Sequence, residues 1–187
     1  MKLGIYIHIP FCKQKCYYCD FPSYAGKETC QDSYLDALLF EIRNAGEVYQ
    51  GRVVDTVFFG GGTPSVLPKE ALPRIITALR ESFILADDVE VSAEANPGTV
   101  DAEKLASWRR AGIGRISFGV QSFHDSLLHS IGRIHTAKEA TDAIRLAREA
   151  GFDNINLDLI YGLPSQTVAM LADDVKRAVS LGIEHIS

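Results

Sequence analysis

The sequence lacks any apolar run long enough to cross a membrane, since a spanning helix needs about 20 consecutive apolar residues. It also lacks the layout of a signal peptide, because His8 and Pro10 interrupt the first apolar stretch. Positive charge is not in excess: the net charge is -5, whereas nucleic-acid-binding proteins usually carry a basic face. We therefore expect no membrane span, no nucleic-acid partner and a cytoplasmic location.

Cysteine is scarce, with 4 among 187 residues, which does not suggest the disulfide framework of a small secreted protein. Three of the four, Cys12, Cys16 and Cys19, nevertheless lie within eight residues in the pattern C-x3-C-x2-C. Thiolates this close can converge on one metal centre, and soft sulfur ligands select zinc or iron–sulfur. Lys13 and Lys15 between them argue against thiols that are merely buried as small apolar side chains.

Two kinds of metal centre fit this cysteine triplet. A closed zinc site needs four ligands, and Cys30, eleven residues after Cys19, would have to supply the fourth. A four-iron cluster held by three cysteines would leave one iron without a protein ligand, and an open iron is a place for chemistry. The absence of a second ligand pair favours the cluster, with zinc as the alternative.

The rest of the chain alternates strand-like and helix-like patterns, which predicts one α/β domain over residues 1–187 with a parallel sheet. Strands are expected at about 3–9, 53–59, 89–95, 115–119 and 154–160. Helices are expected at about 31–44, over 72–83, around Leu105 and Trp108 as far as about Gly112, from 136 onward and at about 167–181. Residues 120–135 are expected to form a long connection, and residues 182–187 to open a sixth strand.

The expected strands are polar on one side, which distinguishes between two parallel architectures. Glu90, Ser92 and Glu94 alternate with apolar residues, as do Asn156 and Asp158. The strands of a doubly wound sheet would be apolar throughout, whereas a partial barrel can hold a polar ligand inside. Barrel enzymes place their sites at the carboxyl ends of the strands, where several of these groups lie. We therefore predict a parallel (β/α)6 partial barrel, truncated at the start of strand six.

A glycine turn, Gly60-Gly61-Gly62-Thr63, closes the second expected strand at this rim. Glycines allow the backbone to approach a ligand closely, although an ordinary turn explains them equally well. No Gly-Lys-Ser/Thr follows, which excludes a P-loop, and Ser65 excludes the G-x-G-x-x-G pattern. The cysteine triplet gives the turn more weight than it has alone.

Four polar residues near the expected strand ends are candidate ligand contacts. Glu94 needs a cation or several donors if it faces a barrel interior, and an ion pair with Arg115 is its structural alternative. Gln121 suits a ribose or a carboxylate, or simply caps a loop. Arg133 suits a carboxylate partner, or lies solvated on the surface. Asp158 lies in a strand rich in Ile and Leu, which argues against a plain surface role.

The segment Tyr6-Ile7-His8-Ile9-Pro10-Phe11-Cys12, with Cys16 and Cys19, resembles the radical S-adenosylmethionine superfamily. Within it, the chain is similar to the group of oxygen-independent coproporphyrinogen III oxidase and HemW. Residues 60–64 (GGGTP), 119–123 (GVQSF) and 158–164 (DLIYGLP) match further motifs of that group. The resemblance covers the whole chain, and the combination of motifs is highly specific.

The resemblance implies a radical S-adenosylmethionine core domain, incomplete at its C-terminus, with a [4Fe-4S] cluster on Cys12, Cys16 and Cys19. The amino and carboxylate groups of S-adenosylmethionine would bind the open iron. An electron from a donor such as a flavodoxin or ferredoxin would then yield methionine and a 5′-deoxyadenosyl radical. The residues matched to S-adenosylmethionine contacts are Tyr6, Tyr18, Gly61, Gly62, Thr63, Glu94, Gln121, Arg133 and Asp158.

Two branches of this group have different activities, and both involve a porphyrin or haem partner. The dehydrogenase branch makes protoporphyrinogen IX by oxidative decarboxylation, and it has a further cysteine two residues after the third. It also has an N-terminal arm before the first strand. Here that cysteine position is Phe21, and the first strand begins almost at Met1. Both departures favour the HemW-like branch, which binds and delivers haem; the oxidase is the alternative.

Overall fold

The computed structural model describes residues 2–187 and contains a six-stranded sheet in which all neighbouring strands are parallel. Its strands are β1 (Leu3–Ile9), β4 (Val53–Gly61), β5 (Ile84–Ala95), β6 (Arg115–Gln121), β7 (Asn154–Leu159) and β8 (His185–Ile186). The main helices are α1 (Gln31–Val48), α2 (Ala71–Ser82), α3 (Ala102–Ala111), α5 (Ala137–Glu149) and α6 (Val168–Ser180).

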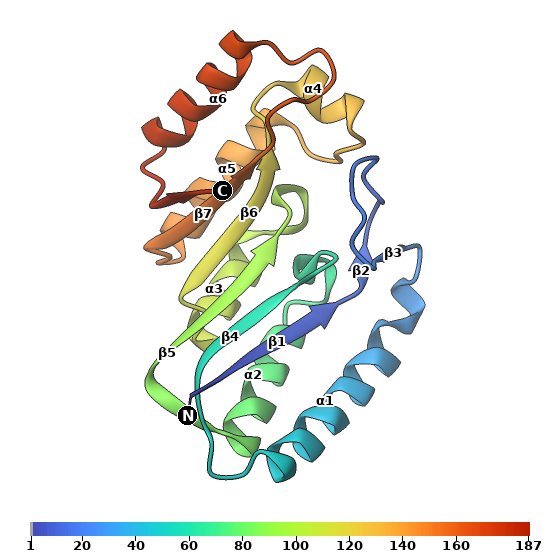
Figure 1. Ribbon diagram of the computed structural model, residues 1–187, viewed down its shortest axis with the longest axis vertical. Coiled ribbons are helices and arrows are strands. Elements are labelled where there is room, and N and C mark those ends of the chain that lie inside the picture. Colours follow the sequence, from blue (N-terminus) through green and yellow to red (C-terminus); the bar gives the residue numbers. More distant parts are fainter. Residues whose placement is uncertain (1) are drawn as a thin grey trace.

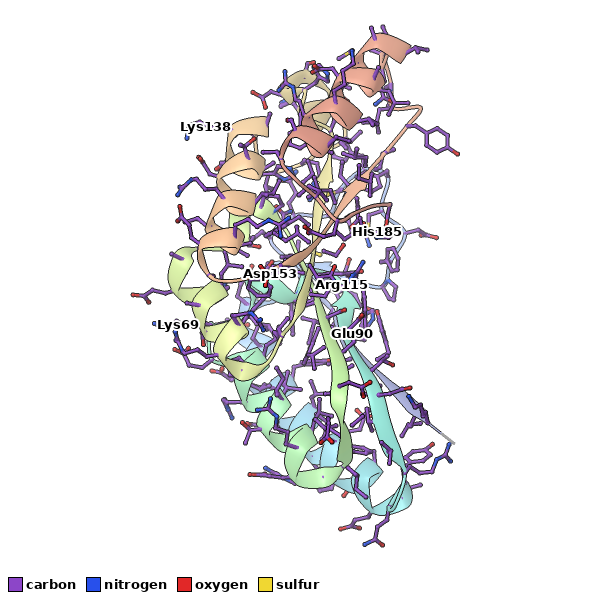
Figure 2. The ribbon with its side chains drawn as sticks, turned by 90° about the vertical axis from the view of Figure 1, so that its left-hand side faces the viewer. Lys69, Glu90, Arg115, Lys138, Asp153 and His185 are labelled. Carbon is purple, nitrogen blue, oxygen red and sulfur yellow. The ribbon has the colours of Figure 1, made fainter. Side chains whose placement is uncertain are left out.

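The strands lie side by side in the same order as in the chain, β1-β4-β5-β6-β7-β8. Each crossover therefore moves in one direction across the sheet, and right-handed crossovers then place all the helices on one face. In Figure 1 the helices lie behind the sheet, and in Figure 2, turned by 90°, they lie to the left of the strands, so the other face of the sheet is uncovered. A doubly wound sheet would reverse its strand order, so the predicted parallel partial barrel is confirmed.

The two faces of the sheet differ as the alternating sequence predicts. The helix-covered face carries the main core, whose strand residues include Ile7, Ile9, Val57, Phe59, Ala93, Ile116, Phe118, Ile155 and Leu157. The opposite face carries polar side chains, among them Glu94, Ser117 and Asn156. Burying one apolar face against helices leaves the polar face free to line a cavity.

Some element boundaries differ from the predictions. Strand β5 begins at Ile84 because its first residues pair with Val53 and Val54 of β4, although Asp87 and Asp88 interrupt the apolar pattern. Helix α1 continues to Val48, four residues past the predicted end.

Two short elements lie where loops were predicted. The connection 120–135 contains α4 (Asp125–Ser130), which is too short to show helical periodicity. Within the cysteine loop, β2 (Phe11–Cys12) pairs with β3 (Tyr24–Ala25).

Helix α5 begins with a capping box, in which the side chains of Thr136 and Glu139 each accept a hydrogen bond from the other residue's backbone N–H. Within residues 2–187, no helix has the length and apolar character that a membrane crossing requires.

Candidate functional site

The cysteines lie in a loop that is fixed at both ends. At its base, the backbone N–H of Tyr24 donates to Pro10 O at 2.8 Å, next to the short β2–β3 pairing. At its far end, Gln14 Nε2 donates to Gly132 O at 3.0 Å, which ties the loop to the turn after α4. The loop therefore stands over the carboxyl ends of the strands, where barrel sites are found (Figure 1).

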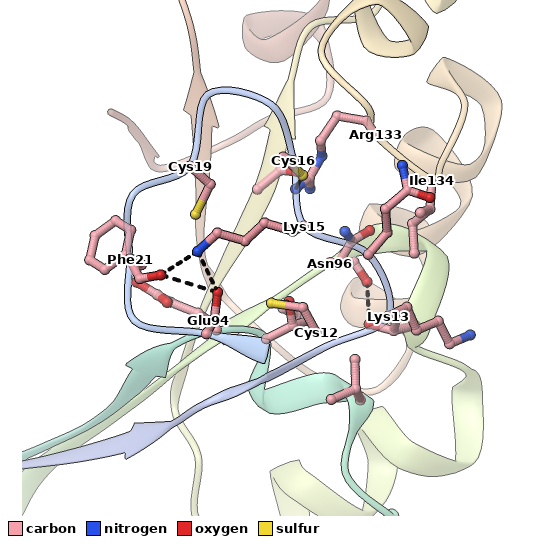
Figure 3. A pocket seen from close by; sticks show the side chains of 18 of the residues that line it. Cys12, Lys13, Lys15, Cys16, Cys19, Phe21, Glu94, Asn96, Arg133 and Ile134 are labelled. Atoms are coloured by element: carbon pink, nitrogen blue, oxygen red, sulfur yellow. Dashed lines mark hydrogen bonds between the residues drawn. The ribbon is translucent and has the colours of Figure 1, made fainter. Parts of the chain in front are cut away.

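One pocket at this rim collects eleven of the twelve predicted site residues. They are Cys12, Cys16, Tyr18, Cys19, Gly61, Gly62, Thr63, Glu94, Gln121, Arg133 and Asp158. The cysteine loop forms one wall, and the ends of β4, β5, β6 and β7 form the other (Figure 3). Residues far apart in the sequence thus meet because parallel strands end at the same edge.

All four cysteines are free, and the three of the triplet are half-buried. Cys12 Sγ lies 3.5 Å from Thr63 Oγ1, and the N–H of Cys19 donates to Cys16 O at 3.1 Å within a tight turn. Cys30 is exposed at the start of α1 and does not line the pocket, so the structure offers no support for it as a fourth zinc ligand.

The donor set fits a cluster better than a single ion. Within residues 2–187, no three His, Cys, Asp or Glu side chains surround a position for one metal ion. A four-iron cluster binds each thiolate at a different iron, so its ligands need not converge on a single point. Three free thiols on one wall of one pocket match that requirement.

The glycine turn strongly favours glycine at two of its positions. Gly61 has φ of +109°, and a Cβ there would lie 2.6 Å from the His8 ring. A Cβ on Gly62 would lie 2.7 Å from Phe11 O. The N–H of Thr63 donates to Phe11 O at 2.8 Å, so the turn packs directly against the strand that leads to the first cysteine.

Two carboxylates line the pocket from the strand ends, Glu94 from β5 and Asp158 from β7. Glu94 Oε2 accepts from Gly61 N–H at 3.2 Å. Burial raises the pKa of Glu94 to about 7, and the charge of Asp158 adds to this. Burial also raises the pKa of Asp158, while hydrogen bonds from Asn156 and Ser117 oppose the shift. The pair is therefore suited to a ligand that brings positive charge or hydroxyl donors.

Gln121, at the end of β6, and Arg133 also line the pocket, and both are held in constrained positions. Gln121 has φ of 70°, next to a register shift in the β6–β7 pairing, and such strain is often found at functional sites. Arg133 donates from Nη2 to Gly119 O and from Nη1 to Cys16 Sγ at 3.5 Å. Its Nε is buried without a partner among the described residues, so this arginine is not a solvated surface residue.

The two predicted tyrosines lie in different places. Tyr18 lines the pocket, and burial raises its pKa to about 12. Tyr6 does not line it: its ring stacks on Phe58 at 6.1 Å on the uncovered sheet face, and its hydroxyl lies 3.2 Å from His8 Nδ1. A contact from Tyr6 to a ligand in the pocket remains a prediction.

Sequence reasoning missed several residues that line the pocket, namely Lys13, Gln14, Lys15, Phe21, Ser23, Val66, Ala95, Asn96, Thr99, Gly119 and Ile134. Asn96 could have been predicted as a pocket residue, because it directly follows the expected strand that ends at Ala95. The alternative ion pair of Glu94 with Arg115 is not formed: the guanidinium lies instead 3.4 Å from His185 Nδ1.

Comparisons with known proteins identify the family of the chain. The family model described as the radical SAM superfamily matches residues 6–178. The heme chaperone HemW of Escherichia coli (strain K12) is 46% identical over 186 residues, which cover 99% of this chain and 49% of that protein. The heme chaperone HemW of Bacillus subtilis (strain 168) is 43% identical, covering 97% and 48%. The chain thus spans about half the length of the curated relatives it matches.

Solved structures show the same fold. Coproporphyrinogen III oxidase (HemN) from Escherichia coli, described as a radical SAM enzyme, superposes with a TM-score of 0.90 at 35% identity. The alignment covers 98% of this chain and 43% of that chain. The radical S-adenosylmethionine methyltransferase TsrM from Kitasatospora setae, at 16% identity, covers 100% of this chain and 35% of that one with a TM-score of 0.70, which speaks for the fold alone. The chain belongs to the radical SAM superfamily.

Proposed function

We propose that this chain binds a [4Fe-4S] cluster through Cys12, Cys16 and Cys19, binds S-adenosylmethionine beside it, and serves in haem binding and delivery. Membership of the superfamily implies the cluster and S-adenosylmethionine. One observation carries the assignment: the three free thiols line the same pocket as the polar groups from four strand ends. Metal ligands and polar binding groups thus share a single cavity.

The bound cluster would supply the electron that cleaves the sulfonium of S-adenosylmethionine. The protein's own groups would hold and orient that ligand. The glycine turn lets its backbone approach closely, and Glu94 and Asp158 would accept from the ligand's ammonium or hydroxyl groups. Arg133 and Gln121 would donate to its carboxylate. Contacts from Thr63, Tyr18 and Tyr6 are proposed from the motif match.

Haem is proposed as the cargo because the two curated relatives described above, from Escherichia coli and Bacillus subtilis, are named heme chaperones. Phe21, in place of a further cysteine, favours the same branch. The second candidate is the oxygen-independent coproporphyrinogen III oxidase, which the TM-score of 0.90 to HemN favours. We also propose a flavodoxin or ferredoxin as electron donor. A reducing cytoplasm would suit thiols that must stay free.

The cluster is tested by anaerobic reconstitution with iron and sulfide, followed by electron paramagnetic resonance before and after S-adenosylmethionine is added. We expect a spectrum that changes on addition, because the ligand would occupy the open iron. Cys16→Ala should abolish both the cluster and the change. A single zinc without inorganic sulfide in oxygen-free material would overturn the assignment.

The two candidate functions are separated by a second experiment. Haem is titrated into the chain while the Soret band is followed, and turnover of coproporphyrinogen III is measured in parallel. Haem binding without turnover supports the chaperone. Conversion to protoporphyrinogen IX would support the oxidase instead.

A further inference from the structure

The two lysines of the cysteine loop take opposite directions, although only one residue separates them in the sequence. Both line the pocket. Figure 3 shows Lys13 extending away from the thiols, whereas Lys15 turns back across the inside of the loop toward Phe21. Because the two lysines carry the same charge and are close in the sequence, Lys13 can serve as the control for the role of the Lys15 ammonium.

The ammonium of Lys15 joins the two limbs of the loop. Its Nζ donates to Phe21 O and, at 3.1 Å, to Ser23 Oγ. Ser23 Oγ in turn donates to Phe21 O at 3.3 Å, and Ser23 is only 8% exposed. The segment between Lys15 and Phe21 contains Cys16 and Cys19, so one side chain closes the turn that presents two of the three thiols.

Lys15 also places a positive charge on the wall that carries the thiols. Its two acceptors are a carbonyl and a hydroxyl oxygen, which are neutral and leave the ammonium's charge uncompensated. Thiolates that bind metal are negatively charged, and a nearby cation favours them. The same charge favours the more negative, reduced state of an iron–sulfur cluster over the oxidised state.

We propose that Lys15 is a positioning residue with two tasks: it orders the cysteine loop before any metal binds, and its charge stabilises the reduced cluster. The first task follows from the hydrogen bonds alone. The second rests on the proposed function, because it requires that a cluster is bound. The two tasks can therefore be tested separately.

The first task is tested on the metal-free chain by hydrogen exchange of the backbone amides in the loop. The Cys19 N–H is the reporter, since it donates to Cys16 O inside the closed turn. Lys15→Met should speed its exchange about tenfold, because charge-assisted hydrogen bonds are lost. Lys15→Arg should restore much of the protection, and Lys13→Met should change the rate by less than about twofold. Equal exchange in the Lys15→Met and Lys13→Met variants would overturn this role.

The second task is tested on the reconstituted chain by measuring the midpoint potential of the cluster. Lys15→Met should shift it to a more negative value, Lys15→Arg should return it toward the original, and Lys13→Met should shift it less. A potential that does not change in Lys15→Met would overturn the electrostatic role. If the unmodified chain takes up no iron and sulfide, the proposed function fails together with this second task, while the exchange result still decides the first.

Discussion

Glu94 Oε2 accepts a hydrogen bond from the backbone N–H of Gly61 at 3.2 Å, which joins the end of β5 to the glycine turn that ends β4. The bond favours the charged carboxylate, yet burial and the charge of Asp158 oppose that charge more strongly. Glu94 is consequently protonated at a pH where an ordinary glutamate is ionised. A ligand that brings a cation would reverse this balance.

The first prediction concerns the stability of the ligand-free chain against pH. The pKa of Glu94 is about 7 in the folded chain and near 4.5 when unfolded. The folded state therefore keeps a proton that the unfolded state has lost. The contribution of the protonated Glu94 to the free energy of unfolding is fully present below about pH 4.5 and is lost as the pH rises through about 7. As the pH rises between these values, the free energy of unfolding should fall by on the order of 2 kcal/mol relative to that of Glu94→Gln.

Urea unfolding at several pH values measures this difference. The Glu94→Gln variant is the control, because it keeps the shape of the side chain and cannot ionise. Parallel stability profiles for the two proteins would contradict the raised pKa. Saturating S-adenosylmethionine should flatten the difference if the ligand places its ammonium beside Glu94.

The second prediction concerns the glycine turn. Gly61→Ala should lower the free energy of unfolding by about 1–3 kcal/mol, because φ of +109° is strained for alanine and its Cβ would meet the His8 ring. Gly114→Ala is the matched control, since a Cβ there meets nothing within 4 Å and its φ is not positive. That variant should lie within about 1 kcal/mol of the original. Chemical denaturation compares the two, and equal losses would refute the steric argument.

The third prediction compares a cysteine that lines the pocket with one that lies outside it. Cys30→Ser should leave iron and sulfide content unchanged after reconstitution, because Cys30 is exposed at the start of α1 and outside the pocket. Cys19→Ser should remove most of both, because its thiol lines the pocket with Cys12 and Cys16. Iron and acid-labile sulfide assays on the two variants decide this. A loss in Cys30→Ser equal to that in Cys19→Ser would revive the four-thiol alternative.

Much of the fold could be predicted because the strands have one apolar face and one polar face. Val57 and Phe59 alternate with other residues in the way a half-buried strand requires, and β4 covers both. The polar residues on the alternate positions indicated a cavity-lining face, and the sheet confirms it. The position of the site followed from parallel topology, which brings the ends of all strands to one edge.

The remaining features depend on tertiary contacts that leave no local pattern. Tyr6 is matched by its motif to a ligand contact, yet its ring packs on Phe58 and does not line the pocket. The positive φ of Gln121 arises where β6 and β7 shift register, which no propensity of glutamine indicates. The inward turn of Lys15 depends on acceptors that only the folded loop provides.

The last prediction concerns two adjacent aspartates on α6 with very different surroundings. Asp174 is fully buried and accepts from Ser122 Oγ at 2.9 Å and from Phe123 N–H at 2.6 Å. These donors belong to the turn that directly follows Gln121. Asp174→Ala should therefore lower the free energy of unfolding by about 2–4 kcal/mol, because the buried donors lose their acceptor.

Asp173 provides the control, because it forms a partly exposed ion pair with Arg177 at 2.8 Å. Asp173→Ala should cost less than about 1 kcal/mol. Urea denaturation measures both losses, and similar values would show that Asp174 does not fix the turn. In the reconstituted chain, Asp174→Asn should also weaken S-adenosylmethionine binding more than Asp173→Asn does, since the turn that Asp174 holds determines where Gln121 lies.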